Sequence, residues 1–248
     1  MRVAAIYDVH GNVPALEAVL AEVEALEVDA VVVGGDIAIG PMPRAALELL
    51  LALGERALFL RGNGDREIAG ETDEEGLWGE QTRWSAEQLD RGQLAWLAAL
   101  PDTQSVVVDG LGPVLFCHGS PRRDDEILTR ISSEERVAAA TAGVSERVIV
   151  CGHTHVQFDR EVAGKRLVNA GSVGLPYEAR PGAYWALLGP DVELRRTEYD
   201  LEAAAAAIRA TGFPEADELA AENVLTVPTA EEATDQFERM ARAENDPK

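Results

Sequence analysis

The stretch Val3-Ala4-Ala5-Ile6-Tyr7-Asp8-Val9-His10-Gly11-Asn12 sets a pattern that the rest of the chain repeats. A short apolar run, long enough for one buried strand, is followed at once by an aspartate, a histidine and a glycine. Residues 14–26 then have helical spacing and begin at Pro14, where a missing N–H costs nothing. The stretch predicts a buried strand that ends in polar residues and leads into a helix.

Four later apolar runs, at residues 30–33, 57–60, 114–117 and 148–151, also end close to Gly, Asp, Asn or His. A second helical segment, residues 43–53, separates the first two of these runs. Strand, helix, strand, helix, strand favours parallel pairing in an α/β fold. Residues 70–80 are typical of an exposed acidic loop, and residues 82–100 of a packed helix.

The pattern changes after residue 155 to short strands at 156–161, 167–169, 183–188 and 192–198, which predicts antiparallel pairing. Residues 200–210 form an alanine-rich helix capped by Asp200. From about residue 212 the chain is acidic and helical with little apolar content, so we expect an extension that packs over an edge or frays. Because no repeat and no long linker interrupts the chain, residues 1–248 are expected to form one domain.

The charge of the chain limits its partners. It has 44 acidic and 22 basic residues, a net charge of −22, which disfavours long nucleic acids and anionic membranes. No apolar run approaches the ~20 residues that span a bilayer, and the first motif leaves no room for a secretory signal. We expect a cytoplasmic protein. Cys117 and Cys151 are either ligands or redox thiols or, the favoured interpretation, small core residues.

All four histidines lie in short glycine-bearing motifs that follow apolar runs, together with two aspartates and an asparagine. Alone, each motif is explained by a turn, a helix cap or a structural histidine. Together they indicate a metal site, because carboxylate, amide and imidazole ligands suit two ions such as Mn, Fe, Co, Ni or Zn, whereas Mg or Ca prefers oxygen alone. The predicted ligands are Asp8, His10, Asp36, Asn63, His118, His153 and His155.

The series D-x-H, G-D, G-N, H and G-H-x-H, from Asp8 to His155, resembles the motif set of the calcineurin-like metallophosphoesterase superfamily. Residues 169–176, Asn-Ala-Gly-Ser-Val-Gly-Leu-Pro, resemble a loop of its small bacterial and archaeal phosphodiesterase-type members. The resemblance implies an α/β fold, a four-layer αββα sandwich of two mixed β-sheets flanked by helices. It also implies an active site where the strand ends of the two sheets meet.

The resemblance further implies a role for each ligand. Asp8, His10 and His155 would hold one ion, and Asn63, His118 and His153 the other. Asp36 would bridge the two ions, which would lie ~3.5 to 4 Å apart and share a hydroxide that attacks the phosphorus in line. Asp36, Asn63 and His118 are the predicted catalytic residues, and Asn63 would also orient the phosphate.

The sequence departs from the family pattern at Gly64. Many members have a histidine there, the usual candidate for protonating the leaving oxygen, and this chain has no other histidine to replace it. Four arginines flank the motifs and would either neutralise developing charge or be solvated surface residues, but arginine stays protonated and cannot be a general acid. They are Arg61, Arg66, Arg122 and Arg123.

The sequence therefore predicts a dinuclear, metal-dependent phosphohydrolase that cleaves phosphodiester or phosphomonoester bonds of a small phosphorylated substrate. The alternative is a non-catalytic, metal-binding interaction scaffold of the retromer-subunit type, which also lacks the motif histidine. The complete set of predicted ligands favours the enzyme over the scaffold. A protein phosphatase is less consistent with the short chain, and the oligomeric state, homodimer included, is left open.

Overall fold

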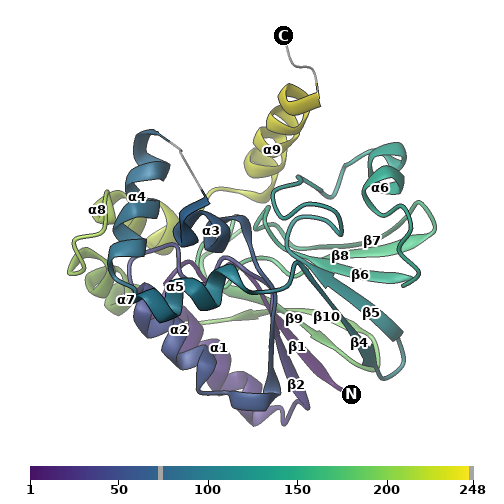
Figure 1. Ribbon diagram of the computed structural model, residues 1–248, viewed down its shortest axis with the longest axis horizontal. Helices are drawn as coiled ribbons and strands as arrows, with labels where there is room; N and C mark the ends of the chain where they lie inside the picture. Colours follow the sequence, from purple (N-terminus) through teal and green to yellow (C-terminus); the bar gives the residue numbers. More distant parts are fainter. Residues whose placement is uncertain (72–74, 246–248) are drawn as a thin grey trace.

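Two five-stranded β-sheets pack face to face, with helices against their outer faces (Figure 1). The computed structural model describes residues 1–71 and 75–245. One apolar cluster lies between the sheets, a second between the first sheet and its helices, and a third between the second sheet and a helix. The predicted four-layer αββα sandwich is confirmed.

The first sheet has the order β10-β9-β1-β2-β3. β1 (Val3–Ile6), β2 (Ala30–Val33) and β3 (Ala57–Phe59) are parallel, as predicted. β9 (Ala183–Leu188) and β10 (Val192–Thr197) complete it in antiparallel pairing. Every residue of β1 and β2 is buried, which explains why these strands are continuous apolar runs.

The second sheet has the order β4-β5-β6-β8-β7. β5 (Gly112–Cys117), β6 (Val148–Cys151) and β8 (Lys165–Asn169) are parallel, whereas β4 (Thr103–Val108) and β7 (Phe158–Val162) are antiparallel edges. The prediction of antiparallel strands after residue 155 holds for β7–β8 and β9–β10. It is wrong for β8, which also pairs in parallel with β6.

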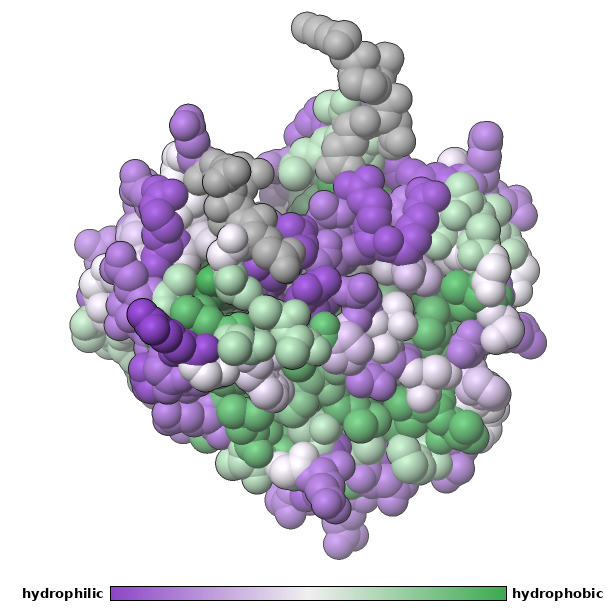
Figure 2. Space-filling view, viewed as in Figure 1, coloured by the Kyte–Doolittle hydropathy of each residue, from purple (hydrophilic) through white to green (hydrophobic). Residues whose placement is uncertain are grey.

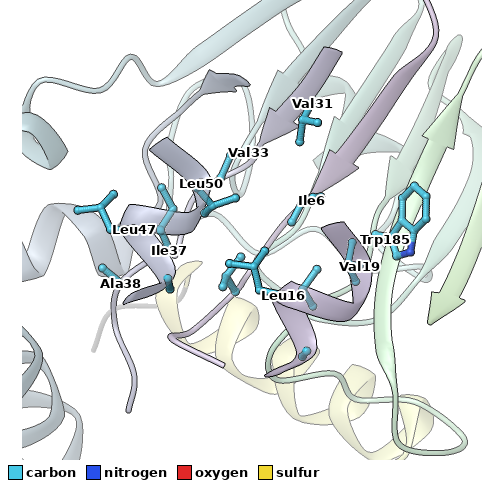
Figure 3. Close-up of a cluster of buried hydrophobic side chains, with 14 of the residues drawn as sticks. Ile6, Leu16, Val19, Val31, Val33, Ile37, Ala38, Leu47, Leu50 and Trp185 are labelled. Atoms are coloured by element: carbon cyan, nitrogen blue, oxygen red, sulfur yellow. The ribbon is translucent and has the colours of Figure 1, made fainter. Parts of the chain in front are cut away.

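Two helices cover the outer face of the first sheet. α1 (Val13–Ala25) begins after Asn12, whose side chain accepts a hydrogen bond from the Ala15 N–H, and α2 (Pro43–Leu51) begins at a proline. Figure 3 shows their apolar side chains against those of the strands, with Trp185 of β9 at one end. The Trp185 indole donates to Thr197 Oγ1 at 2.9 Å, so burial leaves no polar atom of the ring unpaired.

The segment between β3 and β4 is more helical than predicted. It contains α3 (Asn63–Arg66), a π-helical turn (Glu67–Glu71), α4 (Gly76–Glu87) and α5 (Arg91–Ala98), and a 3₁₀ turn (Gly54–Arg56) precedes β3. The predicted loop at 70–80 is wrong at both ends, because residues 70–71 belong to the π-helical turn and α4 begins at Gly76; residues 72–74 lie outside the described residues. The single helix predicted at 82–100 is divided because Asp90 caps α5, accepting from the Gln93 N–H at 2.9 Å.

The C-terminal helices pack more closely than predicted. α7 (Leu201–Arg209), α8 (Ala216–Ala220) and a π-helical turn (Ala221–Leu225) share a buried apolar cluster. Phe213 meets Trp84 of α4 edge to face, with ring centroids 5.3 Å apart. This part of the predicted helical extension is packed and not frayed, because small alanine side chains allow close contact where few large apolar residues are present.

Two further helices lie near the second sheet. α6 (Glu134–Ala140) covers its outer face through Val137 and Ala140. α9 (Ala230–Asn245) projects from the body of the molecule (Figure 1), and its buried Glu238 pairs with Arg136. Hydrophilic side chains gather below α9 in Figure 2. No helix within the described residues is long and apolar enough to cross a membrane.

Candidate metal centre

The seven predicted ligands lie together where the carboxyl ends of the two sheets meet. Each follows a strand: β1 for Asp8 and His10, β2 for Asp36, β3 for Asn63, β5 for His118, and β6 for His153 and His155. All are buried except His153, which is partly exposed. Parallel strands bring residues distant in the sequence to one sheet edge, as the sequence predicts.

Three of these residues form a first potential metal-binding group. One ligand atom from each of Asp8, His10 and His155 lies within 4.8 Å of the others. The His155 Nε2 atom is 3.3 Å from Asp8 Oδ1 and 3.1 Å from His10 Nε2. This is the set that the resemblance assigns to one ion.

A second group consists of Asp8, Asp36 and His118. The His118 Nε2 atom is 3.5 Å from Asp36 Oδ2 and 3.7 Å from Asp8 Oδ1. Asp36 Oδ2 is also 3.8 Å from His10 Nε2. Asp8 is common to both groups, and Asp36 borders the first group through its contact with His10; the bridging role of Asp36 stays a prediction. The His153 ring is next to that of His118, with centroids 5.3 Å apart.

The backbone at the site is held in an uncommon conformation. Among the described residues, eight non-glycine residues have a positive φ, and five of them are predicted ligands. Such a conformation costs about 1–3 kcal/mol per residue and persists only when the surroundings impose it. Here neighbouring loops impose it through hydrogen bonds, such as Asp8 N–H to Gly35 O at 3.1 Å and His10 N–H to Asp36 O at 2.9 Å.

Close backbone approach also requires glycine. A Cβ on Gly35, whose φ is +93°, would lie 2.4 Å from the Gly62 nitrogen. The loops after β2 and β3 can therefore touch only because no side chain separates them. This contact brings Asp36 and Asn63 to the same site.

Three of the histidines have a fixed orientation. The Nδ1 atoms of His10, His118 and His155 lie 3.1, 2.8 and 2.7 Å from the carbonyl oxygens of Ile39, Gly34 and Leu175, respectively. A carbonyl only accepts, so Nδ1 carries the proton and donates it. The Nε2 lone pair of a neutral ring then faces the centre, which is the usual arrangement for a metal-binding histidine.

Several buried atoms at the centre have no hydrogen-bond partner: Asp8 Oδ1, Asn63 Oδ1 and His118 Nε2. Leaving such an atom unpaired costs ~1–3 kcal/mol, and more when it is charged. Asp8 Oδ1 and His118 Nε2 lie 3.7 Å apart, so a divalent cation between them would satisfy both, and the side chains present fit a metal site.

The carboxylates and imidazoles shift each other's pKa values. Burial opposes ionisation of Asp8 and Asp36, but nearby histidines lower both pKa values, chiefly His155 for Asp8 and His118 for Asp36. Burial also opposes a charge on His118, yet Asp36 and Asp8 raise its pKa to about 10. Burial, then His118, lower the pKa of His153 to about 4. Without metal, His118 therefore holds a proton at neutral pH.

Metal binding is therefore expected to release about one proton at pH 7, because a bound imidazole must be neutral. Titration calorimetry in two buffers that differ in ionisation enthalpy measures the number released. The pKa of His118 is above 6.5 in the fold, so its charge stabilises the metal-free protein fully below pH 6.5, and this contribution is lost as the pH rises to about 10. Metal affinity should rise over the same range, and binding without proton release would contradict this assignment.

Asp65 is a functional candidate that the sequence did not single out. It is fully buried, and it accepts hydrogen bonds from the Ile37 N–H at 2.9 Å and the Gly62 N–H at 3.1 Å. Burial and then the charge of Asp36 raise its pKa to about 7. Asp65 positions the loops after β2 and β3, and its place in the Gly-Asn-Gly-Asp motif was the available signal.

The segment at 169–176 supports the loops from β1 and β6. Asn169 donates to Gly152 O at 2.6 Å and to Thr154 Oγ1 at 3.1 Å. Ser172 Oγ donates to Asp8 O at 2.7 Å. The sequence identified this segment by resemblance but gave it no role, and the structure places it beneath the ligands.

Position 64 has no room for a side chain, so it requires glycine. Its N–H donates to Asp36 Oδ1 at 2.7 Å, and a Cβ there would lie 2.6 Å from Ile39 Cγ2 and 3.0 Å from Asp36 Oδ1. Ile39 thus occupies the region that a side chain at position 64 would enter.

The flanking arginines and the cysteines have structural explanations. Each arginine is ion-paired with an acidic neighbour, which favours the surface interpretation. Both cysteines are free and buried, burial raises the pKa of Cys151 to about 12, and neither belongs to a metal-binding group of the described residues. The ion pairs of the four arginines are Arg61–Asp102, Arg66–Asp124, Arg122–Glu126 and Arg123–Asp125.

The four-layer sandwich and the two potential metal-binding groups at its strand ends indicate the class of protein. The chain belongs to the calcineurin-like phosphoesterase superfamily, whose domain profile matches residues 1–189. The resemblance stated from the motifs is confirmed.

Similar proteins are known from archaea and bacteria. The protein MJ0912 of Methanocaldococcus jannaschii is 26% identical over 235 residues, which cover 86% of this chain and 94% of that protein. The structure of PH1004 from Pyrococcus horikoshii has a TM-score of 0.78 at 22% identity, covering 88% of this chain and 97% of that one. A metallophosphoesterase from Sphaerobacter thermophilus has a TM-score of 0.69 at 30% identity, with 89% and 98% covered.

Proposed function

We propose that this protein is a metal-dependent phosphoesterase that hydrolyses small phosphorylated substrates, phosphodiesters or phosphomonoesters. The observation that carries the proposal is the cluster of buried carboxylate and imidazole ligand atoms, in which Asp8 Oδ1 and His118 Nε2 lie 3.7 Å apart and both lack a hydrogen-bond partner. Membership of the calcineurin-like phosphoesterase superfamily supports the same reaction class.

Two divalent ions would be held by the two ligand groups, with Asp36 between them. When bound, such ions stabilise charge on phosphoryl oxygens as Lewis acids. His118 and His155 are held by main-chain carbonyls, so their ligand atoms do not need to move. Asn63 Nδ2 donates weakly to Glu67 Oε1 at 3.5 Å, so it is available to turn toward a substrate oxygen. The imidazoles favour Mn, Fe, Co, Ni or Zn over Mg or Ca.

A non-catalytic, metal-binding scaffold is the second candidate. A scaffold catalyses no reaction and so has little reason to keep left-handed ligand residues and a buried carboxylate oxygen without a partner, both of which destabilise the metal-free fold. The enzyme is therefore preferred. A protein loaded with both ions that hydrolyses no ester in a panel of aryl monoesters, diesters and cyclic nucleotides would refute the proposal and favour the scaffold.

The substrate is further limited by the absence of a side chain at Gly64. General acid assistance is worth ~10²- to 10⁴-fold, so its absence should slow alkyl leaving groups far more than acidic aryl ones. We expect log kcat/KM to fall steeply as the leaving-group pKa rises, from nitrophenols to simple alcohols. The measurement is a series of phosphate esters that differ only in the leaving group, under conditions in which chemistry limits the rate. A flat dependence would mean that another group donates the proton.

A further inference from the structure

The ring of His153 is held differently from the rings of the other three histidines at the metal centre. Main-chain carbonyls fix His10, His118 and His155 through their Nδ1 atoms. The backbone of His153 is also fixed, because its N–H donates to Asp8 Oδ2 at 2.9 Å and its φ is +65°. Its imidazole, however, makes no hydrogen bond to any residue that the structure describes. The direction of this predicted ligand is therefore set by packing.

Phe237 of α9 is an aromatic side chain that packs against His153. The two ring centroids are 6.2 Å apart and the rings are inclined by 53°, which is within the ~4.5–7 Å range of interacting aromatic pairs. His153 is the one predicted ligand that is partly exposed. Phe237 therefore both limits the rotation of this imidazole and reduces its contact with water.

Tyr177 extends the aromatic packing to the other group of ligands. Its ring stacks on that of His155, with centroids 5.0 Å apart and an angle of 29°, and its N–H donates to His155 O at 3.1 Å. The centroids of Tyr177 and Phe237 are 6.3 Å apart. The two rings thus connect His155 with His153. Phe237 is the member of this set that lies outside the superfamily domain, which ends at residue 189.

A buried ion pair attaches α9 to the body of the molecule at the position of Phe237. Glu238, the next residue, is 8% exposed, pairs with Arg136 of α6 and accepts from Ser132 Oγ at 3.3 Å. Ala233, one turn earlier, is 7% exposed. Separating a buried carboxylate from its partners is strongly destabilising. This part of α9 is therefore firmly attached, although the helix projects from the body (Figure 1).

We propose that α9 completes the metal centre, with Phe237 as a positioning residue for the ion that His118 and His153 would hold. The ring of Phe237 keeps the His153 imidazole in one rotamer, so less rotational freedom is lost when this ligand binds a metal. The proposal rests on the two-metal site of the proposed function. It makes the C-terminal extension a part of the active site.

Phe237→Ala is expected to weaken the binding of one Mn²⁺ ion by about 3- to 10-fold and to leave the other ion unaffected. An aromatic pair contributes less than the hydrogen-bonded partners of metal ligands, whose loss costs ~10- to 100-fold in affinity. Titration calorimetry on metal-free protein measures both affinities. Phe237→Tyr keeps the ring and should restore the affinity of the unmodified protein.

Electron paramagnetic resonance adds a readout that a general loss of stability does not change. Neighbouring Mn²⁺ ions give a coupled spectrum, whereas a single bound ion gives an uncoupled signal. With Mn²⁺ near the Kd of the weaker site, the Phe237→Ala protein should show more of the uncoupled signal. Met240→Ala is the matched control, because it shortens an apolar side chain of the same helix at an exposed position.

Unchanged affinities in the Phe237→Ala protein, equal weakening of both ions, the same loss in Met240→Ala, or no recovery in Phe237→Tyr would overturn the proposal. Hydrolysis of bis(4-nitrophenyl) phosphate separates it from the proposed function. Turnover together with unchanged metal affinities in Phe237→Ala would overturn the positioning role alone. Selective weakening of one ion without turnover by any of the proteins would support the positioning role and overturn the hydrolase.

Discussion

Asp36→Asn is expected to lower kcat/KM by at least ~10²- to 10³-fold, the loss that follows removal of a single charge-stabilising group in other active sites. The substitution keeps the size of the side chain, and asparagine tolerates the left-handed backbone, where φ is +50°. It removes a negative charge 3.5 Å from His118 Nε2 and 3.8 Å from His10 Nε2. Steady-state kinetics together with metal analysis of the same preparation measure the effect.

The matched control is Asp217→Asn, which makes the same change at an exposed position of α8. It should leave both rate and metal content unchanged. Near-normal turnover by the Asp36→Asn protein with both ions still present would show that Asp36 does not bridge them.

Removing both metals with a chelator is expected to abolish hydrolysis and lower the melting temperature by about 10 to 20 °C. Saturation to ~100 times Kd contributes ~2.7 kcal/mol per site, and 1 kcal/mol corresponds to roughly 2–4 °C in a chain of this size. The physical cause is the loss of partners for the buried Asp8, Asn63 and His118 atoms. The shift should diminish on acidification, because a proton competes with the metal for His118.

Differential scanning calorimetry with and without chelator, between pH 5.5 and 8, checks this expectation. His155→Asn protein serves as the control, since it lacks one ligand and should show a smaller shift. An unchanged melting temperature at neutral pH, in protein shown to have lost its metal, would mean that the site does not contribute to stability.

The strands and the site could be predicted because both leave direct signals in the sequence. β1, β2 and β6 are buried on both faces, so they are uninterrupted apolar runs, and parallel pairing places the polar residues that follow them at one edge. Histidine occurs only four times in the chain, and every occurrence lies at this edge. The assignment of Asp8 and Asp36 to particular ions stays a prediction.

Features that depend on contacts distant in the sequence could not be predicted. β4 was not predicted because its exposed position 107 is a valine. Val107 is 66% exposed, so the run Val106-Val107-Val108 lacks the alternation of apolar and polar residues that is typical of an edge strand. The packing of α7 with α8 depends on alanines, which carry little signal. Asp65 follows a glycine just as Asp36 does, and only the hydrogen bonds to residues 37 and 62 distinguish a positioning residue from a ligand.

The carbonyl contacts of His10, His118 and His155 have a consequence for the exchange of metal ions with the surroundings. Because these contacts hold each ring by its Nδ1 atom, the Nε2 atoms face the centre, and these three ligands need no change of rotamer to bind an ion. Reloading of stripped protein is then set by how fast the ion sheds its own water and His118 releases its proton. Metal availability during growth, rather than a slow folding step, would decide which ion the protein carries when it is isolated.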